Sequence, residues 1–458
     1  MDVADSIVDL IGHTPLVRLR RLVEAESLHC DLLAKVELVN PGGSVKDRIA
    51  VAMIDEAERT GALRPGGTIV EPTSGNTGAG LAIVAAQRGS KCIFVMSDKM
   101  SDEKVALLRS YGAEVVVCPT AVPPEDPRSY YSTAERLVRE TPGAFRPDQY
   151  SNMANPRAHE LSTGPEIWQQ TEGTVTHFVA GIGTGGTITG VARYLKSQNP
   201  DVQIVGADPA GSVYSGGSGR PYLVEGVGED FWPTTFDPTL VDRVVEVSDA
   251  DSFLTARRVT RDEGLLIGGS CGTAVHAALE VARELHHGDV VVVLLPDSGR
   301  SYLSKIFDDG WMYDMGFLRA AGMVAGDVLD TKGNRMPDLV LITPEEPVRD
   351  AIKLMHDTGV SQLVVSVTKE LPLAVKEVTG SLQELALMDL AFRDPAVLDR
   401  PVGDVCGAPM PMVGVGEPIA RVVECLEQGP SIVVVGDGHP IGVLTRSDVL
   451  SFLAARTS

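Results

Sequence analysis

Lys46 is the residue of this sequence whose position is most suggestive of chemistry. A strand over residues 31–38 runs into Asn40-Pro-Gly-Gly, and a helix is expected to open next, with Ser44 as its N-cap and Asp47 in a capping-box relation to it. The positive end of a helix dipole disfavours an ammonium group and so lowers the pKa of a lysine amine in the first turn. The placement favours a nucleophilic, imine-forming amine, but by itself it also fits an ordinary solvated lysine.

The segment Thr73-Ser-Gly-Asn-Thr-Gly78 offers a second chemical feature. It follows an apolar strand over residues 68–71 and precedes a helix over residues 79–87. Hydroxyl groups, an amide and exposed backbone N–H groups therefore meet at a helix start, and such a nest suits a carboxylate.

The segment Gly181-Ile-Gly-Thr-Gly-Gly186 is a third feature, between a strand and a helix over residues 188–197. Small residues let backbone N–H groups converge on an anion at a helix start. The spacing also fits a dinucleotide fingerprint, and Asp208 ends the next strand where a ribose-binding acid would lie. An NAD-dependent dehydrogenase is thus an alternative, although the motif is not in the first strand-helix unit, where NAD-binding folds carry it.

Together, an amine that can form an imine, a phosphate cradle and a carboxylate nest are what a pyridoxal phosphate enzyme acting on an amino acid requires. Apolar strands alternate with amphipathic helices from the start of the chain to about residue 310. This alternation predicts an α/β fold in which helices cover both faces of a parallel sheet and hold the three loops.

The motifs Ile11-Gly-His-Thr-Pro, Asn40-Pro-Gly-Gly-Ser-Val-Lys, Thr73-Ser-Gly-Asn-Thr-Gly and Gly183-Thr-Gly-Gly-Thr resemble those of fold type II pyridoxal phosphate enzymes. The resemblance covers residues 1–310 and implies a two-lobed catalytic unit. Within this group, the segments 148–156, 224–231 and 263–270 are most similar to the cystathionine β-synthases.

The resemblance implies a role for each matching residue. Lys46 would hold pyridoxal 5′-phosphate covalently and move the substrate's α-proton, and Ser270 would face the pyridine nitrogen. Asn76 would bind the cofactor's ring oxygen, and its phosphate would be held by Gly183, Thr184, Gly185, Gly186 and Thr187. The substrate carboxylate would be held by Thr73, Ser74, Thr77 and Gln149, with Tyr150 beside them.

The implied reaction joins L-serine and L-homocysteine into L-cystathionine, which is a β-replacement. A cysteine synthase that uses O-acetylserine or serine with sulfide is the nearest alternative. Glu229 stands where related synthases commonly have Tyr, so contacts to the second substrate stay open. No haem is expected, because the chain starts about ten residues before Ile11, and His13 is interpreted as a structural hydrogen-bonding residue.

Two similar segments, 340–355 and 412–426, indicate an internal duplication after a Gly-containing stretch. We expect a linker at 311–336 and two CBS domains at 337–395 and 396–458. Thr445 and Asp448 in the second repeat suit a ribose, whereas Gln383 and Ala386 stand at the aligned positions of the first. The resemblance suggests S-adenosylmethionine or another adenosyl effector; alternatively, the pair only caps a helix. A nucleotide sensor with an inactive catalytic half is a further alternative.

Composition limits the remaining possibilities. The 458 residues carry a formal charge of −22, which argues against a nucleic-acid partner, and no apolar run is long enough to cross a membrane. Six scattered cysteines without a Cys-x-x-Cys pair predict neither disulfides nor a metal site. We expect a cytoplasmic enzyme that forms a homodimer or homotetramer.

Overall fold

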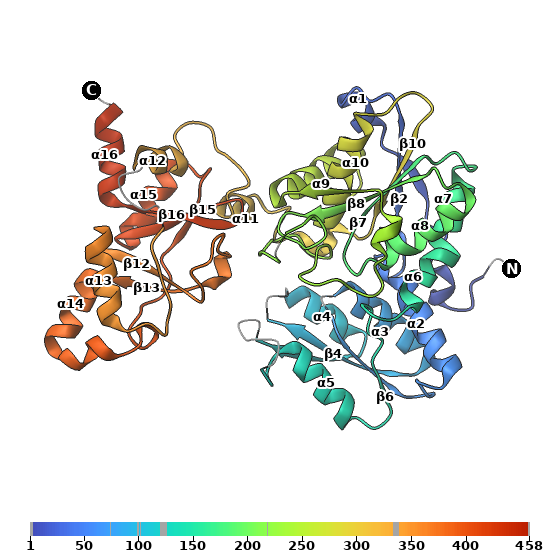
Figure 1. Ribbon diagram of the computed structural model, residues 1–458, viewed down its shortest axis with the longest axis horizontal. Coiled ribbons are helices and arrows are strands. Elements are labelled where there is room, and N and C mark those ends of the chain that lie inside the picture. Colours follow the sequence, from blue (N-terminus) through green and yellow to red (C-terminus); the bar gives the residue numbers. More distant parts are fainter. Residues whose placement is uncertain are drawn as a thin grey trace. The chain divides into compact units, whose positions relative to one another are not determined.

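The computed structural model describes residues 3–73, 75–98, 100, 102–119, 126–217, 219–332 and 339–456 (Figure 1). Contacts divide the chain into two units. The first comprises Met1–Arg220 and Val224–Leu303, and the second comprises Pro221–Leu223 and Ser304–Ser458. Each unit is described separately below.

The first unit contains a six-stranded sheet in the order β1-β2-β10-β7-β8-β9, in which only the edge pair β1–β2 is antiparallel. Its strands are β1 (Leu16–Arg18), β2 (Asp31–Val36), β7 (His177–Gly181), β8 (Gln203–Pro209), β9 (Arg243–Val247) and β10 (Val290–Leu295). Every residue of β10 is buried, as expected for a strand covered on both faces.

Successive residues of a strand point to opposite faces of the sheet, so strands that are apolar throughout present two apolar faces. Helices cover both of these faces. Val292 and Leu294 share one apolar cluster with Ile188 and Val191 of α8, while α10 packs against β7, β8, β10 and α9. The helices around this sheet are α1 (Arg20–Ala25), α6 (Ala154–Ala158), α7 (Gly164–Gln170), α8 (Gly186–Gln198), α9 (Asp249–Glu263) and α10 (Gly269–Ala282). A π-helical turn, η3 (His159–Thr163), joins α6 to α7.

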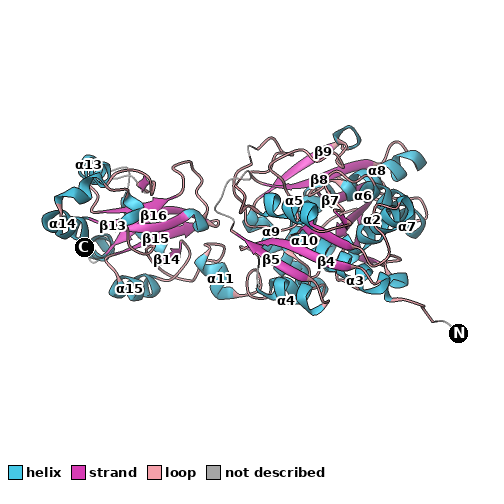
Figure 2. Ribbon diagram, turned by 90° about the horizontal axis from the view of Figure 1, so that it is seen from below, coloured by secondary structure: helices cyan, strands magenta, loops and turns pink. Residues whose placement is uncertain are grey.

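A smaller, fully parallel sheet in the order β5-β4-β3-β6 forms the other lobe of this unit (Figure 2). Its strands are β3 (Thr68–Pro72), β4 (Lys91–Ser97), β5 (Glu114–Cys118) and β6 (Ala144–Phe145). The helices α2 (Lys46–Thr60), α3 (Asn76–Arg88) and α4 (Asp102–Ser110) share one apolar cluster on this sheet. Ala134 and Leu137 of α5 (Tyr130–Glu140) pack on the other face, against Val95. The predicted two-lobed α/β architecture is confirmed.

The second unit contains two three-stranded sheets with the same plan. In each, the first and second strands are parallel and the third is antiparallel to the second. The first repeat contains β11 (Leu341–Ile342), α13 (Val348–Thr358), β12 (Gln362–Ser366), β13 (Val378–Gln383) and α14 (Glu384–Arg393). The second contains β14 (Met412–Gly414), α15 (Ile419–Gln428), β15 (Ser431–Gly436), β16 (His439–Thr445) and α16 (Arg446–Arg456). The predicted duplication is therefore present in the fold.

The stretch 311–336, expected to be a linker, contains helical structure where it is described. It includes most of α11 (Asp309–Asp314) and all of α12 (Ala325–Lys332). Ala325 and Val328 are buried in the core of the second repeat, beside Val413 and Leu444. The linker was expected because this stretch contains several glycines. Its apolar residues at helical spacing form a helix instead, because their burial in the core stabilises that helix.

Candidate active site

The candidate active site lies where three neighbouring parallel strands of the larger sheet end. β2 leads to Lys46, β7 leads into the glycine loop, and β10 leads to Asp297. The carboxyl ends of parallel strands lie at one edge, which is where open α/β sheets bind ligands. A cavity opens there, with Lys46, Gly183, Thr184, Gly185, Thr187 and Gly226 among its lining residues.

Lys46 is the first residue of α2, and the segment before it is fastened to the sheet edge. Val45 N–H donates to Pro296 O at 2.8 Å, and Lys46 N–H donates to Ser44 Oγ at 3.2 Å. Burial lowers the pKa of the Lys46 amine, although the carboxylates of Asp297 and Glu229 oppose the shift. The lowered pKa expected from the sequence is thus present, with burial as its main cause.

The capping box predicted at this helix start is wrong. α2 begins with Val45 in the N-cap position and without a side-chain cap. The carboxylate of Asp47 instead accepts the backbone N–H of Gly42, because the Pro-Gly-Gly turn folds back toward the helix. Burial, with a smaller contribution from Glu37, raises the pKa of Asp47 to about 7 although the Gly42 N–H opposes the shift.

The glycine loop packs so tightly against neighbouring residues that Gly185 and Gly186 have no room for side chains. A Cβ on Gly185 would lie 2.3 Å from Phe236 Cβ, and one on Gly186 would lie 1.9 Å from Asn155 Oδ1. Gly185, at φ 76°, is the N-cap residue of α8. The loop therefore presents backbone N–H groups and the positive end of a helix dipole to the cavity that holds Lys46, which is an anion site.

The predicted carboxylate nest lies at the start of α3. Thr73 Oγ1 accepts the backbone N–H groups of Gly75 at 3.2 Å and Gly78 at 3.1 Å, so its hydroxyl binds two N–H groups at the start of the helix. Thr77 Oγ1 donates to Gln149 Oε1 at 2.7 Å. The structure brings these residues together because β3 and β6, which precede them, are adjacent parallel strands. Ser74, predicted in the same nest, lies outside the described residues.

The loop that carries Gln149 and Tyr150 is held from both sides. Glu71, at the end of β3, accepts the backbone N–H of Gln149 at 3.3 Å, and burial raises the pKa of Glu71 to about 7 although such bonds oppose the shift. Asn155 Nδ2 donates to Gln149 O at 2.8 Å and to Thr184 Oγ1 at 3.0 Å. Sequence reasoning missed Glu71 and Asn155, which connect the nest to the glycine loop.

Asp297 is the second group that the sequence analysis missed. It is 3 % exposed and accepts Asn76 Nδ2 at 2.9 Å and Tyr302 Oη at 2.7 Å. Its position at the carboxyl end of β10 is a signal that could have identified it. Ser270, the second residue of α10, is 2 % exposed, and its Oγ would lie 3.8 Å from a Cβ on Gly226, at the cavity wall.

Lys104 of α4 connects the smaller lobe to the cavity wall. Its amine pairs with Glu225, which immediately precedes Gly226, and lies 4.8 Å from the centre of the Tyr302 ring. This contact was also missed, because α4 and residue 225 are far apart in the sequence and nothing in the sequence pairs them.

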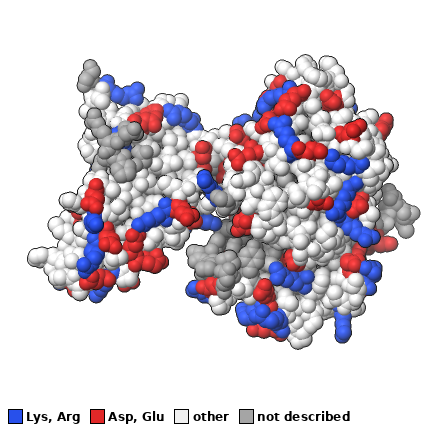
Figure 3. Space-filling model, viewed as in Figure 1, with Lys and Arg blue, Asp and Glu red and all other residues white. Residues whose placement is uncertain are grey.

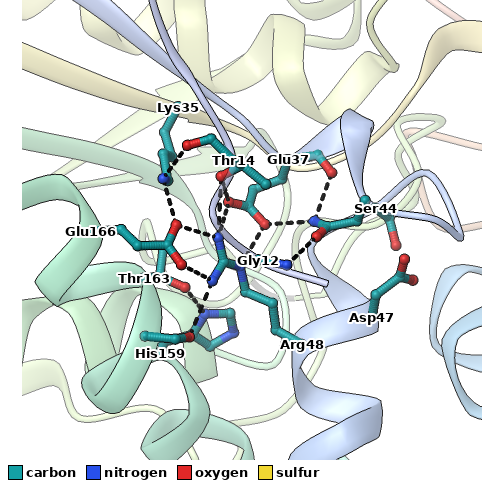
Figure 4. A network of polar contacts seen from close by, with 12 residues as sticks. Gly12, Thr14, Lys35, Glu37, Ser44, Asp47, Arg48, His159, Thr163 and Glu166 are labelled. Carbon is teal, nitrogen blue, oxygen red and sulfur yellow. Dashed lines mark hydrogen bonds and ion pairs between the residues drawn. The ribbon is translucent and has the colours of Figure 1, made fainter. Parts of the chain in front are cut away.

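A buried ion network anchors α2 on the side away from the cavity (Figure 4). Arg48 donates to Glu37 at 2.8 Å and to Glu166 at 2.7 Å, and the fully buried Lys35 also donates to Glu166 at 2.7 Å. Arg48 and Lys35 hold the pKa of Glu166 at about 2, although burial opposes this. His13 contributes its backbone N–H, which donates to Glu166 Oε1 at 3.0 Å. This network of two cations and two carboxylates holds α2 in a fixed position.

Comparison with known proteins adds to this geometry. Residues 7–297 match the family described as pyridoxal-phosphate dependent enzyme. The chain belongs to the pyridoxal-phosphate dependent enzymes. Residues 327–371 and 402–455 match the CBS domain family, which confirms the paired C-terminal repeat.

Two relatives and one solved structure show the extent of the similarity. Rabbit (Oryctolagus cuniculus) cystathionine β-synthase is 50 % identical over 68 % of this chain and 58 % of its own length. The chain thus spans less than two thirds of that relative. Cystathionine β-synthase of Dictyostelium discoideum is 37 % identical over 98 % of this chain and 92 % of its own length. An O-acetylserine dependent cystathionine β-synthase from Helicobacter pylori matches with a TM-score of 0.62 and 39 % identity, over 67 % of this chain and 99 % of that one.

The residues at the cavity fit the cofactor of this family, pyridoxal phosphate. The glycine cradle would bind the cofactor's phosphate, and Thr184 and Thr187 line the cavity beside it. The Lys46 amine lines the same cavity. Asp208, which would bind a ribose in a dinucleotide fold, instead accepts Ser215 N–H and Oγ–H, both at 2.8 Å.

In the second unit, Thr445 and Asp448 contact each other. The backbone N–H and the hydroxyl of Thr445 both donate to Asp448 Oδ2 at 2.7 Å, and Lys332 Nζ lies 3.5 Å from that oxygen. These contacts place both residues at the start of α16, where they can cap the helix, and they leave part of each side chain exposed.

Three further properties belong to the described residues only. They contain no group of three or more His, Cys, Asp and Glu side chains able to hold a metal ion. None of their helices is both long and apolar enough to cross a membrane. On the face that Figure 3 shows, their basic and acidic side chains are interspersed, without one continuous basic patch.

We predict that Arg48→Met will lower the free energy of unfolding by about 3–5 kcal/mol, because Glu37 loses the guanidinium paired with it in a buried environment. Urea unfolding of the full-length chain, followed by circular dichroism, measures this change.

The matched control is Arg136→Met, which removes an exposed pair with Glu140 on α5 and should cost less than about 0.5 kcal/mol. If Arg48→Met costs no more than the control, the network does not anchor α2.

Proposed function

We propose that this chain catalyses a β-replacement in which L-serine and L-homocysteine give L-cystathionine and water. The observation that carries the proposal is that one cavity holds both the Lys46 amine and the glycine cradle of α8, with the nest of Thr73, Thr77 and Gln149 nearby. The names of the relatives support the choice of substrates.

The nest accounts for binding of the amino-acid substrate. The hydroxyl of Thr73 and the Thr77–Gln149 pair surround the start of α3, where a carboxylate is favoured by the helix dipole. Asn76 donates to Asp297 at 2.9 Å, and its remaining amide atoms would bind the cofactor's ring oxygen beside this nest. The substrate would thus be held by its carboxylate, with its α-carbon directed toward Lys46.

Lys46 accounts for the proton transfers. Because its pKa is lowered, a larger fraction of the amine is unprotonated near neutral pH and can accept the α-proton. When bound, the cofactor supplies an electron sink for the charge that develops at the α-carbon. The serine hydroxyl would leave from the β-carbon as water with the α-proton that Lys46 accepted. The homocysteine thiol would give its proton to the Lys46 amine as its sulfur bonds to the β-carbon, and Lys46 would deliver that proton to the α-carbon.

The walls of the cavity would limit entry of water. Lys104 pairs with Glu225 and covers Tyr302, whose hydroxyl is bound to Asp297. This chain of contacts joins the smaller lobe to the wall at Gly226 and Val227. A closed site favours β-replacement by the thiol over loss of the reactive species to water.

Lys46→Ala should abolish turnover of serine with homocysteine, because Lys46 carries the one side-chain amine among the described residues that line the cavity, and this amine would carry the α-proton and bind the cofactor covalently. Cystathionine formation is measured with cofactor in excess. Lys35→Ala is not a suitable control, because it disrupts the ion network, so exposed Lys91→Ala is used. Near-normal rates for Lys46→Ala would overturn the proposed catalytic role.

A cysteine synthase that uses sulfide is the second candidate, and Glu229 is the observation that favours it. This carboxylate is close enough to Lys46 to act on its pKa, and it would repel the carboxylate of homocysteine but not a neutral sulfide species.

We expect kcat/KM for homocysteine to exceed that for sulfide at saturating serine, with Glu229→Gln raising only the homocysteine value. A higher value for sulfide in the unmodified enzyme would overturn the cystathionine assignment in favour of cysteine synthesis.

We also propose that the second CBS domain binds an adenosyl ligand through Thr445 and Asp448. The exposed part of the Asp448 carboxylate, in the first turn of α16, suits a ribose, whereas the first repeat has Gln383 and Ala386 at the aligned positions. S-adenosylmethionine is the ligand that the resemblance favours.

Calorimetric titration of the full-length chain with S-adenosylmethionine and with ATP should show saturable heat for the first. Asp448→Ala should remove it, while Asp389→Ala, on the corresponding helix of the first repeat, should not. No heat with either ligand would leave the pair with its capping role alone.

A further inference from the structure

His159 lies buried directly behind the glycine loop, outside the set of residues that the sequence identified. It begins the π-helical turn η3 and is 1 % exposed. Its Nε2 lies 3.2 Å from Thr187 Oγ1, and its Nδ1 lies 2.9 Å from Thr163 Oγ1. Thr187 in turn lines the cavity beside Lys46. A chain of three side chains therefore ends at the anion cradle.

The His159 ring is neutral in this environment. Burial holds its pKa well below the usual range, and the positive charges of Arg48 and Lys46 act in the same direction, against Glu166. A neutral imidazole carries one N–H donor and one bare nitrogen acceptor. Two hydrogen-bond arrangements are thus available to the chain, and they run in opposite directions.

The chemistry of the ligand selects between them. A phosphate oxygen only accepts hydrogen bonds. A threonine hydroxyl that binds a phosphate oxygen must therefore donate its single proton to that oxygen. Thr187 can do so only if its oxygen accepts the proton of His159 Nε2–H. The bare Nδ1 then accepts the hydroxyl proton of Thr163. In the opposite arrangement Thr187 would give its proton to His159 and turn oxygen lone pairs toward the phosphate.

We propose that His159 is a positioning residue that, as its Nε2–H tautomer, directs the Thr187 hydroxyl toward the cofactor's phosphate, and that the Thr163 hydroxyl stabilises this tautomer by donating to the bare Nδ1. The proposal rests on the cofactor of the family and not on the choice of the second substrate.

The fold holds the His159 ring in place for this role. A Cβ on Gly190 of α8 would lie 2.7 Å from His159 Cβ and 2.0 Å from Pro156 O, so only glycine lets α6 and η3 approach α8 this closely. Gly164 N–H donates to His159 O in the wider turn of a π-helix. Such turns are frequent at functional sites, and this one sets Thr163 beside the ring.

The ion network adds a further restraint. Arg48 Nη1 donates to Ser162 Oγ at 3.2 Å, which ties η3 to α2. In Figure 4, His159 and Thr163 lie next to Arg48 and Glu166. The ring therefore has a fixed neighbour on each nitrogen and little room to rotate.

The test compares His159→Gln with His159→Asn in the full-length enzyme. The glutamine amide reaches the position of Nε2 and can still donate to Thr187, whereas the asparagine amide reaches only the position of Nδ1. Pyridoxal 5′-phosphate binding is measured by equilibrium dialysis. We expect His159→Asn to weaken binding by roughly tenfold or more, the usual loss for a hydrogen bond to a charged group, and His159→Gln to stay within about threefold of the unmodified enzyme.

A second pair tests the choice of tautomer. Thr163→Val removes the proton donor to Nδ1 and should weaken cofactor binding, and Thr163→Ser should restore it. Thermal unfolding of the cofactor-free proteins is measured in parallel. If Thr163→Val and Thr163→Ser bind the cofactor equally, the proposed stabilisation of the tautomer by Thr163 is overturned.

The tautomer can also be observed in the unmodified protein, which avoids any dependence on variants that fold poorly. In ¹⁵N-histidine-labelled holoenzyme, the His159 ring signals are identified by their absence from the His159→Gln spectrum. A proton on Nε2 supports the proposal. A proton on Nδ1, or cofactor binding by His159→Asn as tight as that of the unmodified enzyme, overturns it.

Discussion

The pairing of Arg48 with Glu37 and Glu166 is the interaction on which the rest of the catalytic unit depends. Charges buried in a protein interior are tolerated only when they are paired and hydrogen-bonded, so α2 must lie where its guanidinium reaches both carboxylates. Lys46 lies two positions earlier on the same helix, about 200° around its axis at 3.6 residues per turn. Fixing Arg48 in the interior therefore turns Lys46 toward the cavity.

The second constraint is the common direction of the parallel strands. Loops after β2, β7 and β10 meet at one edge of the larger sheet, and loops after β3 and β6 meet at one edge of the smaller. Anionic groups of the ligands can then be met by backbone N–H groups and helix dipoles at α3 and α8. Such local sites would let a chain with a formal charge of −22 bind phosphate and carboxylate, because the positive potential comes from the loops and not from the net charge.

Hydrogen bonds also join the proposed substrate and cofactor sites. Asn155 bridges Gln149 O and Thr184 Oγ1, and Thr235 Oγ1 donates to Thr184 O at 2.6 Å and contacts Tyr150 O at 3.1 Å. Because most of these bonds are buried, a shift of the Gln149 loop would be transmitted to the glycine loop, the proposed phosphate cradle. The relative position of the two sites is therefore set by a few hydrogen bonds from residues that need touch neither ligand.

The sequence by itself determined the α/β class, the amine at a helix start, the two glycine-rich nests and the C-terminal duplication. Each of these depends on local spacing, because strand and helix periodicity and the conformational freedom of glycine are written into neighbouring residues. Only the tertiary structure decided that Asp297 holds Asn76, that His159 backs Thr187 and that Arg48 joins Glu37 to Glu166. It also showed that Val328 belongs to a core helix and not to a linker. These partners are far apart in the chain or depend on long-range packing, and their pairing follows from burial, which no local pattern specifies.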